Sequence, residues 1–125
     1  MHPEVVAIKI PASPIYLQVI RLVAAGLASR LKFTIDEIED LKMAVDEMAA
    51  YFTGANGRDG TIEIRFEIAD DCLEITGAGT FAPGEKVRTD LTDFSRMILE
   101  TVTDSASLQQ VNGTPTFNLV KSKSS

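Results

Sequence analysis

The sequence contains a single cysteine, Cys72, and a single histidine, His2. One cysteine cannot form a disulfide within the chain, and one cysteine with one histidine is too few for a Cys/His zinc site. Cys72 falls in a strand-like pattern, where a small buried side chain is more common than a reactive thiol. We therefore expect neither a disulfide framework nor a metal site.

Positive charge is also scarce. Twelve basic residues face eighteen acidic ones, so the net charge is −6, and the sequence pI is about 4.7. No basic run is longer than the closing segment KSKSS. Because nucleic-acid binding depends on lysine and arginine contacts to phosphates, the sequence predicts a poor nucleic-acid binder. Proteins or small ligands are the expected partners.

Long hydrophobic runs are missing. No segment approaches the roughly 18 apolar residues of a membrane span, and no cationic leader precedes an apolar block. We therefore expect a cytoplasmic protein that does not associate with membranes. With 125 residues, 45% hydrophobic and 24% charged, the composition is that of one folded domain. We expect this domain over residues 1–120 and a polar tail over 121–125.

The first third of the chain predicts a strand and a helix. Residues 4–10 are rich in β-branched residues and end at Pro11, as a strand would. Ser13 then stands at an N-cap position, with Pro14 at the first helical position. The apolar residues of this helix, over about 15–31, spread beyond one face. A neighbouring helix of the same domain and a dimer or partner surface explain that breadth equally well.

The second helix has clearer signals. Thr34 and Glu37 have the spacing of a capping box, and one apolar stripe faces the core: Leu41, Val45, Met48 and Phe52. Asp46 and Glu47 are adjacent but lie about 100° apart on the helix, so they do not form a pair. We expect Asp46 to be solvated near Lys42. Glu47 lies with Tyr51 on the flank of the apolar stripe.

The remainder predicts two hairpins around a third helix. Residues 61–69 alternate apolar and polar, and Asp70-Asp71 turns the chain into a second strand over 72–76. Residues 77–90 read as irregular, and 91–103 read as a helix with these side chains inward: Leu91, Phe94, Ile98 and Val102. Residues 105–111 and 116–120 pair around the turn NGTP. The expected fold is α+β: a two-layer sandwich with about five mostly antiparallel strands and three helices on one face.

The segment IPASPIYLQVIRLVAAGLASRLKFTIDEIEDLKMAVDE, the following strand pair and the closing NGTPTFNLVK carry a family resemblance. Over roughly residues 5–121 the chain resembles the anti-sigma-factor serine kinases of the RsbW and SpoIIAB type, in the GHKL ATPase superfamily. The resemblance implies a Bergerat-type sandwich that binds ATP, sequesters a sigma factor and phosphorylates a serine on an anti-anti-sigma protein. Members of this family often form homodimers.

The family's nucleotide site is built from three short boxes. In the first, a glutamate is followed four residues later by an asparagine that holds magnesium. By resemblance Glu47 is the candidate catalytic base, since a held carboxylate can activate a hydroxyl for attack on a phosphate. Tyr51 occupies the asparagine position, and tyrosine is a poor magnesium ligand.

The second box is D-x-G-x-G, whose aspartate reads the adenine amino group. Gly77 and Gly79 keep the glycine spacing, although glycines there also suit a turn. The aspartate position falls on Ile75, or on Thr76 in the alternative register. Neither residue is a carboxylate, and threonine accepts a hydrogen bond more weakly than an ionised group does.

The third box is G-x-G-L, whose backbone amides cradle phosphates at a helix N-terminus. Here Ser95 and Met97 replace the glycines. Arg96 offers a cation to a phosphate, or is ordinary surface. Gly113 and Thr114 match the family's closing Gly-Thr, and they also fit an ordinary hairpin turn.

The fold-bearing segments thus match the family better than the chemistry-bearing boxes. We interpret the chain as a binding module that keeps the anti-sigma scaffold, with weak or lost binding of ATP and magnesium and no kinase activity. One alternative is an active serine kinase with Glu47 as base and ATP seated on Gly77 and Gly79. A second alternative is a scaffold or dimerisation domain that uses the first helix.

Overall fold

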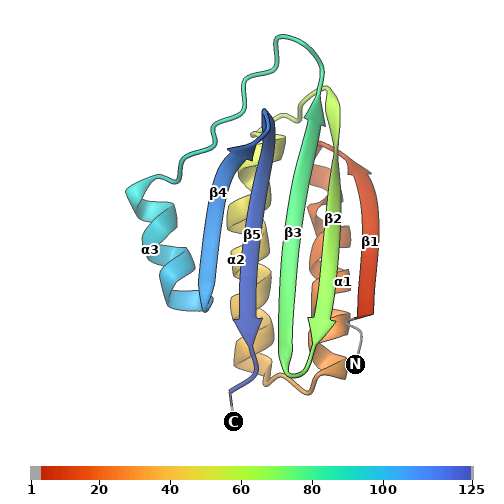
Figure 1. Cartoon of the computed structure of the whole chain (residues 1–125), viewed down its shortest axis with the longest axis vertical. Helices are drawn as coiled ribbons and strands as arrows, with labels where there is room; N and C mark the ends of the chain where they lie inside the picture. Colours follow the sequence, from red (N-terminus) through yellow and green to blue (C-terminus); the bar gives the residue numbers. More distant parts are fainter. Residues whose placement is uncertain (1–3, 125) are drawn as a thin grey trace.

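The computed structural model describes residues 4–124, so His2 lies outside the described residues. The elements, in chain order (Figure 1), are β1 (Glu4–Pro11), a short 3-10 helix η1 (Pro14–Tyr16), α1 (Leu17–Arg30), α2 (Ile35–Thr53), β2 (Gly60–Ala69), β3 (Cys72–Phe81), α3 (Asp93–Val102), β4 (Ser105–Val111) and β5 (Thr114–Ser122). The predicted order of strands and helices is confirmed.

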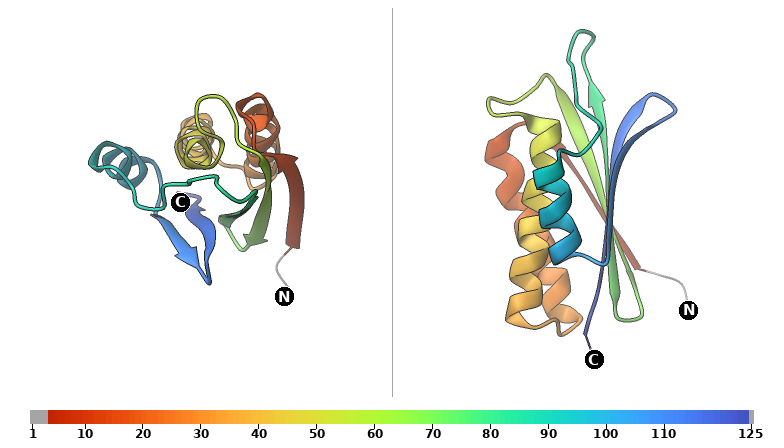
Figure 2. Two further views of the ribbon diagram at one scale, coloured as in Figure 1. Left: turned by 90° about the horizontal axis from the view of Figure 1, so that it is seen from above. Right: turned by 90° about the vertical axis from the view of Figure 1, so that its left-hand side faces the viewer.

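The five strands form one sheet in the order β1-β2-β3-β5-β4, and every neighbouring pair is antiparallel. Figure 2 shows the three helices together on one face of this sheet. The predicted two-layer α+β sandwich is therefore confirmed. No helix within residues 4–124 has the length and apolar character needed to cross a lipid bilayer.

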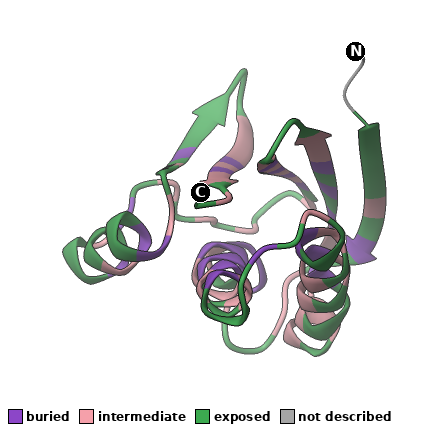
Figure 3. Ribbon diagram, turned by 90° about the horizontal axis from the view of Figure 1, so that it is seen from below, coloured by how far each residue is buried: buried purple, intermediate pink, exposed green. Residues whose placement is uncertain are grey.

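The core lies between the helices and the inner face of the sheet, where the buried residues gather (Figure 3). All four residues of the predicted α2 stripe, Leu41, Val45, Met48 and Phe52, are fully buried. On β2, Ile62, Ile64 and Phe66 are fully buried, whereas Glu63 and Arg65 are exposed on the opposite face. The alternation of β2 thus sets which sheet face packs against the helices.

The first helix begins differently from the sequence prediction. Ser13 has extended backbone geometry at the cap position but makes no side-chain capping bond, and Pro14 opens η1 rather than α1. The three-residue η1 is a tighter turn, as often precedes an α-helix. The α-helix itself begins at Leu17.

The broad apolar surface of α1 is only partly covered by its own domain. Ile20, Ala24 and Ala28 are fully buried in the core. In contrast, Ile15 on η1 is 75% exposed and Leu22 on α1 is 62% exposed. A neighbouring helix therefore explains one side of α1, and the other side faces solvent.

The predicted capping box at the start of α2 is confirmed. Thr34 Oγ1 accepts the backbone N–H of Glu37 at 3.1 Å, and Glu37 Oε1 accepts the backbone N–H of Thr34 at 2.7 Å. The other carboxylate oxygen, Oε2, accepts the backbone N–H and the hydroxyl of Ser124, each at 2.7 Å. The hydrogen bond from the Thr34 N–H is the largest cause that lowers the pKa of Glu37 from 4.5 to about 2, and the hydrogen bonds from Ser124 lower it further. Burial acts in the opposite direction.

This depressed pKa predicts a stability loss in acid. Because Glu37 has a lower pKa in the folded chain than in the unfolded chain, its stabilisation is complete above pH 4.5 and is lost as the pH falls toward 2. We expect the melting temperature of Glu37→Gln to fall less between these pH values than that of the wild-type chain. Thermal unfolding by circular dichroism across this range measures the difference. Parallel melting curves at all pH values would contradict the prediction.

Strand β3 is longer than predicted. It continues to Phe81, so Gly77 and Gly79 lie within a strand and not in an irregular segment or a turn. The sequence pattern failed here because glycines are uncommon inside strands and usually indicate loops. β5 similarly runs to Ser122, which extends the strand into the first two residues of the expected tail.

The face of α3 that packs against the core also differs from the sequence prediction. Phe94, predicted to point inward, is 66% exposed, so that prediction was wrong. Ser95 and Leu99 are buried instead, and Val102 is buried as predicted. The helix begins at Asp93 with Thr92 as its N-cap, and a polar contact with α2 determines its rotation.

Candidate functional site

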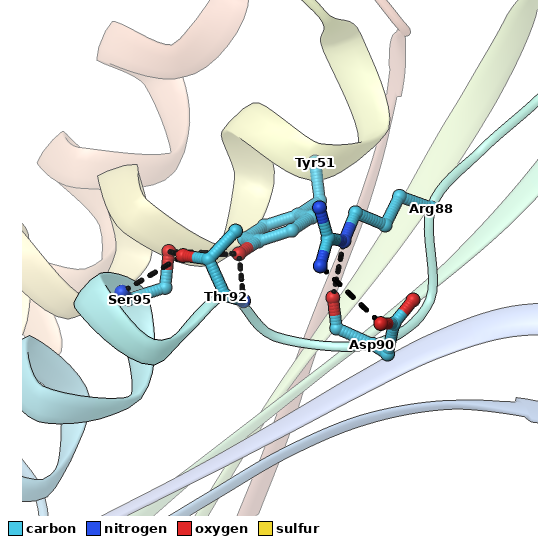
Figure 4. Close-up of polar contacts among 5 residues, drawn as sticks. All are labelled: Tyr51, Arg88, Asp90, Thr92 and Ser95. Carbon is cyan, nitrogen blue, oxygen red and sulfur yellow. Dashed lines mark hydrogen bonds and ion pairs between the residues drawn. The ribbon is translucent and has the colours of Figure 1, made fainter.

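Four polar side chains connect α2 to the N-terminus of α3. The hydroxyl of Tyr51 accepts the backbone N–H of Thr92 at 3.0 Å and lies 2.7 Å from Ser95 Oγ, to which it donates (Figure 4). The hydroxyl of Ser95 in turn donates to Glu47 Oε2 at 2.6 Å. These contacts form a continuous hydrogen-bonded chain, Thr92 N–H to Tyr51 to Ser95 to Glu47, which we call the α2–α3 clasp.

The local sequence accounts for the clasp. Glu47 and Tyr51 are four residues apart, so one helical turn places them on the same face of α2. Thr92 Oγ1 accepts the backbone N–H of Ser95 at 3.0 Å, as an N-cap threonine does. This cap fixes the first turn of α3 and directs the Ser95 side chain toward α2. Ser95, only 4% exposed, has its hydroxyl fully engaged.

The phenol of Tyr51 has a perturbed pKa. Burial raises its pKa, but hydrogen bonds with Ser95 and Thr92 and the positive charge of Arg88 outweigh burial and place the pKa below 10.0. Arg88 lies in the segment before α3 and pairs with Asp90 at 3.3 Å (Figure 4). The phenol is thus held by α3 and by the loop that leads into it.

Asp46 does not share this environment, and the expectation that it is simply solvated was wrong. Its Oδ1 accepts from Arg21 Nε at 2.8 Å, which joins α2 to α1. Both side chains are partly exposed, so the pair contributes little stability by itself. Asp46 and Glu47 therefore face different helices, as their angular separation requires.

Gly77 and Gly79 lie on the inner face of β3 beneath aromatic rings. A Cβ atom on Gly77 would lie 2.2 Å from the ring of Phe117, and one on Gly79 would lie 2.2 Å from the ring of Phe81. The ring of Phe52 packs edge-to-face on both phenylalanines, with centroid distances of 5.4 Å to Phe117 and 6.0 Å to Phe81. The space left by the glycines is occupied by the chain's own side chains.

The two positions for the second-box acid lie on opposite faces of β3. Ile75 is fully buried in the core. Thr76 points to the outer face of the sheet, where its Oγ1 accepts from Asn118 Nδ2 at 3.1 Å. The structure therefore separates Thr76 from the clasp, and neither position presents a carboxylate to the helical side.

Of the other predicted site residues, Gly113 and Thr114 line one cleft together with Gly79, whereas Arg96 lies apart from it on α3. Arg96 and Met97 are exposed on α3. Gly113 has a φ of 81° and follows Asn112, with a φ of 53°, in the two-residue turn between β4 and β5. Both positive φ values are those of a type I′ hairpin turn, which explains this glycine. Thr114 begins β5.

Two residues that hold the elements around the clasp were missed by sequence reasoning. Thr92 could have been recognised as an N-cap, because a threonine stands immediately before a helical pattern. Arg58 carried no local signal. It reaches back to the C-terminus of α2, donating to the Phe52 carbonyl at 3.0 Å, and forward to the Lys86 carbonyl at 2.7 Å. Arg58 thereby ties the loop after β3 to α2.

The five-stranded antiparallel sheet with three helices on one face is consistent with a GHKL-like α/β sandwich. Comparison with known proteins shows which sequences the chain is similar to. The chain is 42% identical over 77 residues to the serine-protein kinase RsbW of Bacillus pumilus and 41% identical over 77 residues to that of Bacillus subtilis. It is 36% identical over 75 residues to RsbW of Halalkalibacterium halodurans. The chain is a relative of the RsbW-type serine-protein kinases, which confirms the family resemblance.

The similarity is partial in extent. The matches cover 58–59% of this chain, less than the range over which the sequence resembles the family, and 46–48% of each of these three relatives. The chain spans about half the length of the curated relatives it matches. No protein-family model matches the chain.

Proposed function

We propose that this chain is an anti-sigma-type binding module that engages a sigma factor, an anti-anti-sigma partner or both, without binding ATP and without kinase activity. The observation that carries the proposal is the α2–α3 clasp. In it, Glu47, the candidate base, is bound by Ser95, a side chain from the position of a phosphate-binding glycine. Such partners are cytoplasmic, so a cytoplasmic location is part of the proposal.

The residues present fit magnesium and ATP poorly at the family's positions. The phenol of Tyr51 stands where the family has a metal-holding amide and is already committed to Thr92 and Ser95. Aromatic rings occupy the space beside Gly77 and Gly79. Each missing charge-assisted hydrogen bond to the nucleotide or its metal weakens the binding free energy by roughly 1.5–3 kcal/mol. Several such deficits together would bring a micromolar site below detection.

The exposed apolar residues of η1 and α1 support protein binding. Ile15, Val19 and Leu22 are 75%, 39% and 62% exposed, and Arg21 lines a shallow pocket together with Leu22. Apolar groups beside an arginine are typical of protein interfaces. The same surface favours a second candidate, in which two copies of the chain dimerise through α1. Sedimentation velocity separates the two, because only the second predicts a dimer of the isolated chain that Leu22→Ser disrupts.

The proposal predicts that millimolar Mg–ATP leaves the melting temperature unchanged. A ligand at a hundred times its dissociation constant would stabilise the fold by roughly 2.7 kcal/mol, a shift of several degrees. Differential scanning fluorimetry measures this, with the RsbW protein of Bacillus subtilis as the comparison. A reproducible shift would favour an active kinase with a divergent pocket.

Partner binding is tested in the same conditions. Sigma-factor and anti-anti-sigma proteins encoded near the gene are assayed by pull-down with and without Mg–ATP. We expect capture that is independent of nucleotide and weakened by Leu22→Ser. Val111→Ser is the matched control, because Val111 is also an exposed apolar residue, 44% exposed, but lies on β4. Failure of both partner classes to bind would contradict the proposal.

A further inference from the structure

A cleft opens where the end of β3 separates from the start of β5. Figures 1 and 2 show the two strands diverging at this end of the sheet. The cavity between them has a volume of about 370 Å³, within the range of ligand-binding pockets. Its lining residues come from three segments: the end of β3, the loop at 82–87 and the β4–β5 hairpin.

Pro115 explains why the strands separate. The β3–β5 ladder includes Gly77 opposite Phe117 and ends with Ala78 opposite Thr116. Continuing the register would place Pro115 opposite Gly79, but proline has no N–H to donate to a ladder. β3 nevertheless continues to Phe81 against β2. Within the described chain, its last residues therefore have no ladder partner on the β5 side.

The wall formed by the loop is a tight turn. The backbone N–H of Glu85 donates to the Ala82 carbonyl at 3.2 Å, and Gly84 has a φ of 94°. Proline at the second position and glycine at the third are typical of a type II turn. The backbone N–H of Ala82 donates to the Asp59 carbonyl at 2.9 Å and continues the pairing with β2.

The opposite wall is the hairpin turn at Asn112 and Gly113, which is as tightly defined. The loop is anchored a second time by Arg58, which binds the Lys86 carbonyl. Two tight turns and an anchored loop make the cleft largely pre-formed. A ligand would therefore need little ordering of the protein to bind.

The chemistry of the lining indicates the ligand. Among the described residues that line the cleft, Glu85 alone carries a charge, and it is negative. No cation is present there to receive a phosphate, whereas the strand edge at Gly79 and Phe81 offers backbone groups. A free strand edge binds extended peptides by adding a strand. Glu85 would complement a lysine or arginine on that strand.

We propose that this cleft binds an extended peptide segment of a partner protein, which pairs with the β3 edge at Gly79 and Phe81 and places a basic side chain beside Glu85. The site lies between strands and is separate from the apolar surface of η1 and α1. The inference therefore adds a second contact to the proposed function and does not depend on the identity of the partner.

The probe is the peptide acetyl-Val-Thr-Lys-Val-Thr-amide, titrated into the full chain labelled with nitrogen-15. We expect amide shifts at Gly79, Phe81, Glu85 and Gly113. The same peptide with N-methyl groups at alternate residues should cause none, because it lacks the donors for strand pairing. Glu85→Gln should weaken binding about two- to fivefold, the effect of losing one exposed ion pair.

The variant Pro115→Val gives an independent test. Valine restores a backbone N–H opposite Gly79, so the ladder can extend and close the cleft. We expect slower hydrogen exchange at Gly79 and loss of the peptide shifts. No shifts at millimolar peptide, equal binding of the N-methylated peptide, or Mg–ATP moving the same amides would overturn the proposal. Absence of peptide binding leaves the Mg–ATP melting result unaffected, so the two proposals fail separately.

Discussion

The variant Gly77→Val is expected to unfold about 8–15 °C below the wild-type chain, a loss of about 2–3 kcal/mol. The reason is a direct overlap. A Cβ at this position would lie 2.2 Å from Phe117 Cε2 and 2.5 Å from Phe117 Cζ. Thermal and urea unfolding of the two proteins measure the loss.

The ring of Phe117 cannot move aside at low cost. It is fully buried, and the ring of Phe52 packs edge-to-face against it. Protein interiors are packed as densely as organic crystals, so displacing one ring displaces its neighbours. The gain from replacing a flexible glycine, roughly 0.5–1 kcal/mol, is smaller than this strain.

Two controls identify the cause. Gly26 lies in α1, and a Cβ added to it would meet no neighbouring side chain within 4 Å, so Gly26→Ala should stabilise the protein by about 0.5–1 kcal/mol. Adding Phe117→Leu to Gly77→Val should recover part of the loss, because leucine lacks the far ring atoms. Strictly additive effects in this double-mutant cycle would contradict the overlap.

The packing around Gly77 gives the family glycines a different physical explanation in this chain. Glycine at 77 and 79 admits the rings of Phe117 and Phe81, which with Phe52 fill the inner face of β3. Aromatic packing is therefore a sufficient reason for glycine at both positions. The glycines alone are not support for a nucleotide site.

Local signals predicted much of the fold. The capping box at Thr34 and Glu37 and the apolar stripe of α2 depend on contacts within one helix, so their spacing is visible in the sequence. The alternation of β2 likewise predicted its buried face. The strand order β1-β2-β3-β5-β4 was not predicted, because β1 pairs with β2 and β3 pairs with β5 across long stretches of sequence.

The prediction errors arose where tertiary contacts determine the length of a strand or the orientation of a helix. β3 extends through two glycines because β2 pairs with it as far as Phe81. Phe94 faces outward because the clasp rotates Ser95 toward α2, and no sequence period contains that information. Glu47 and Tyr51 could be placed together from their spacing. Their contacts with Ser95, which is 48 residues from Glu47 and 44 from Tyr51, could not be predicted.

The clasp also predicts the outcome of restoring the first nucleotide box. Tyr51→Asn should destabilise the chain by about 2–3 kcal/mol and should not create nucleotide binding. Asparagine is too short to reach Thr92 and Ser95, so the clasp loses its central member along with the partly buried ring. Nucleotide binding should not return, because Ser95 and Met97 still replace the third-box glycines and no acid stands at Ile75 or Thr76.

The matched variant Tyr51→Phe separates the hydroxyl from the ring. It keeps the ring and removes the hydrogen bonds, so it should cost about 1 kcal/mol. Both variants should speed hydrogen exchange in the first turn of α3, since the Thr92 N–H loses its acceptor. A melting shift of Tyr51→Asn with millimolar Mg–ATP would show that the other two boxes still hold a nucleotide.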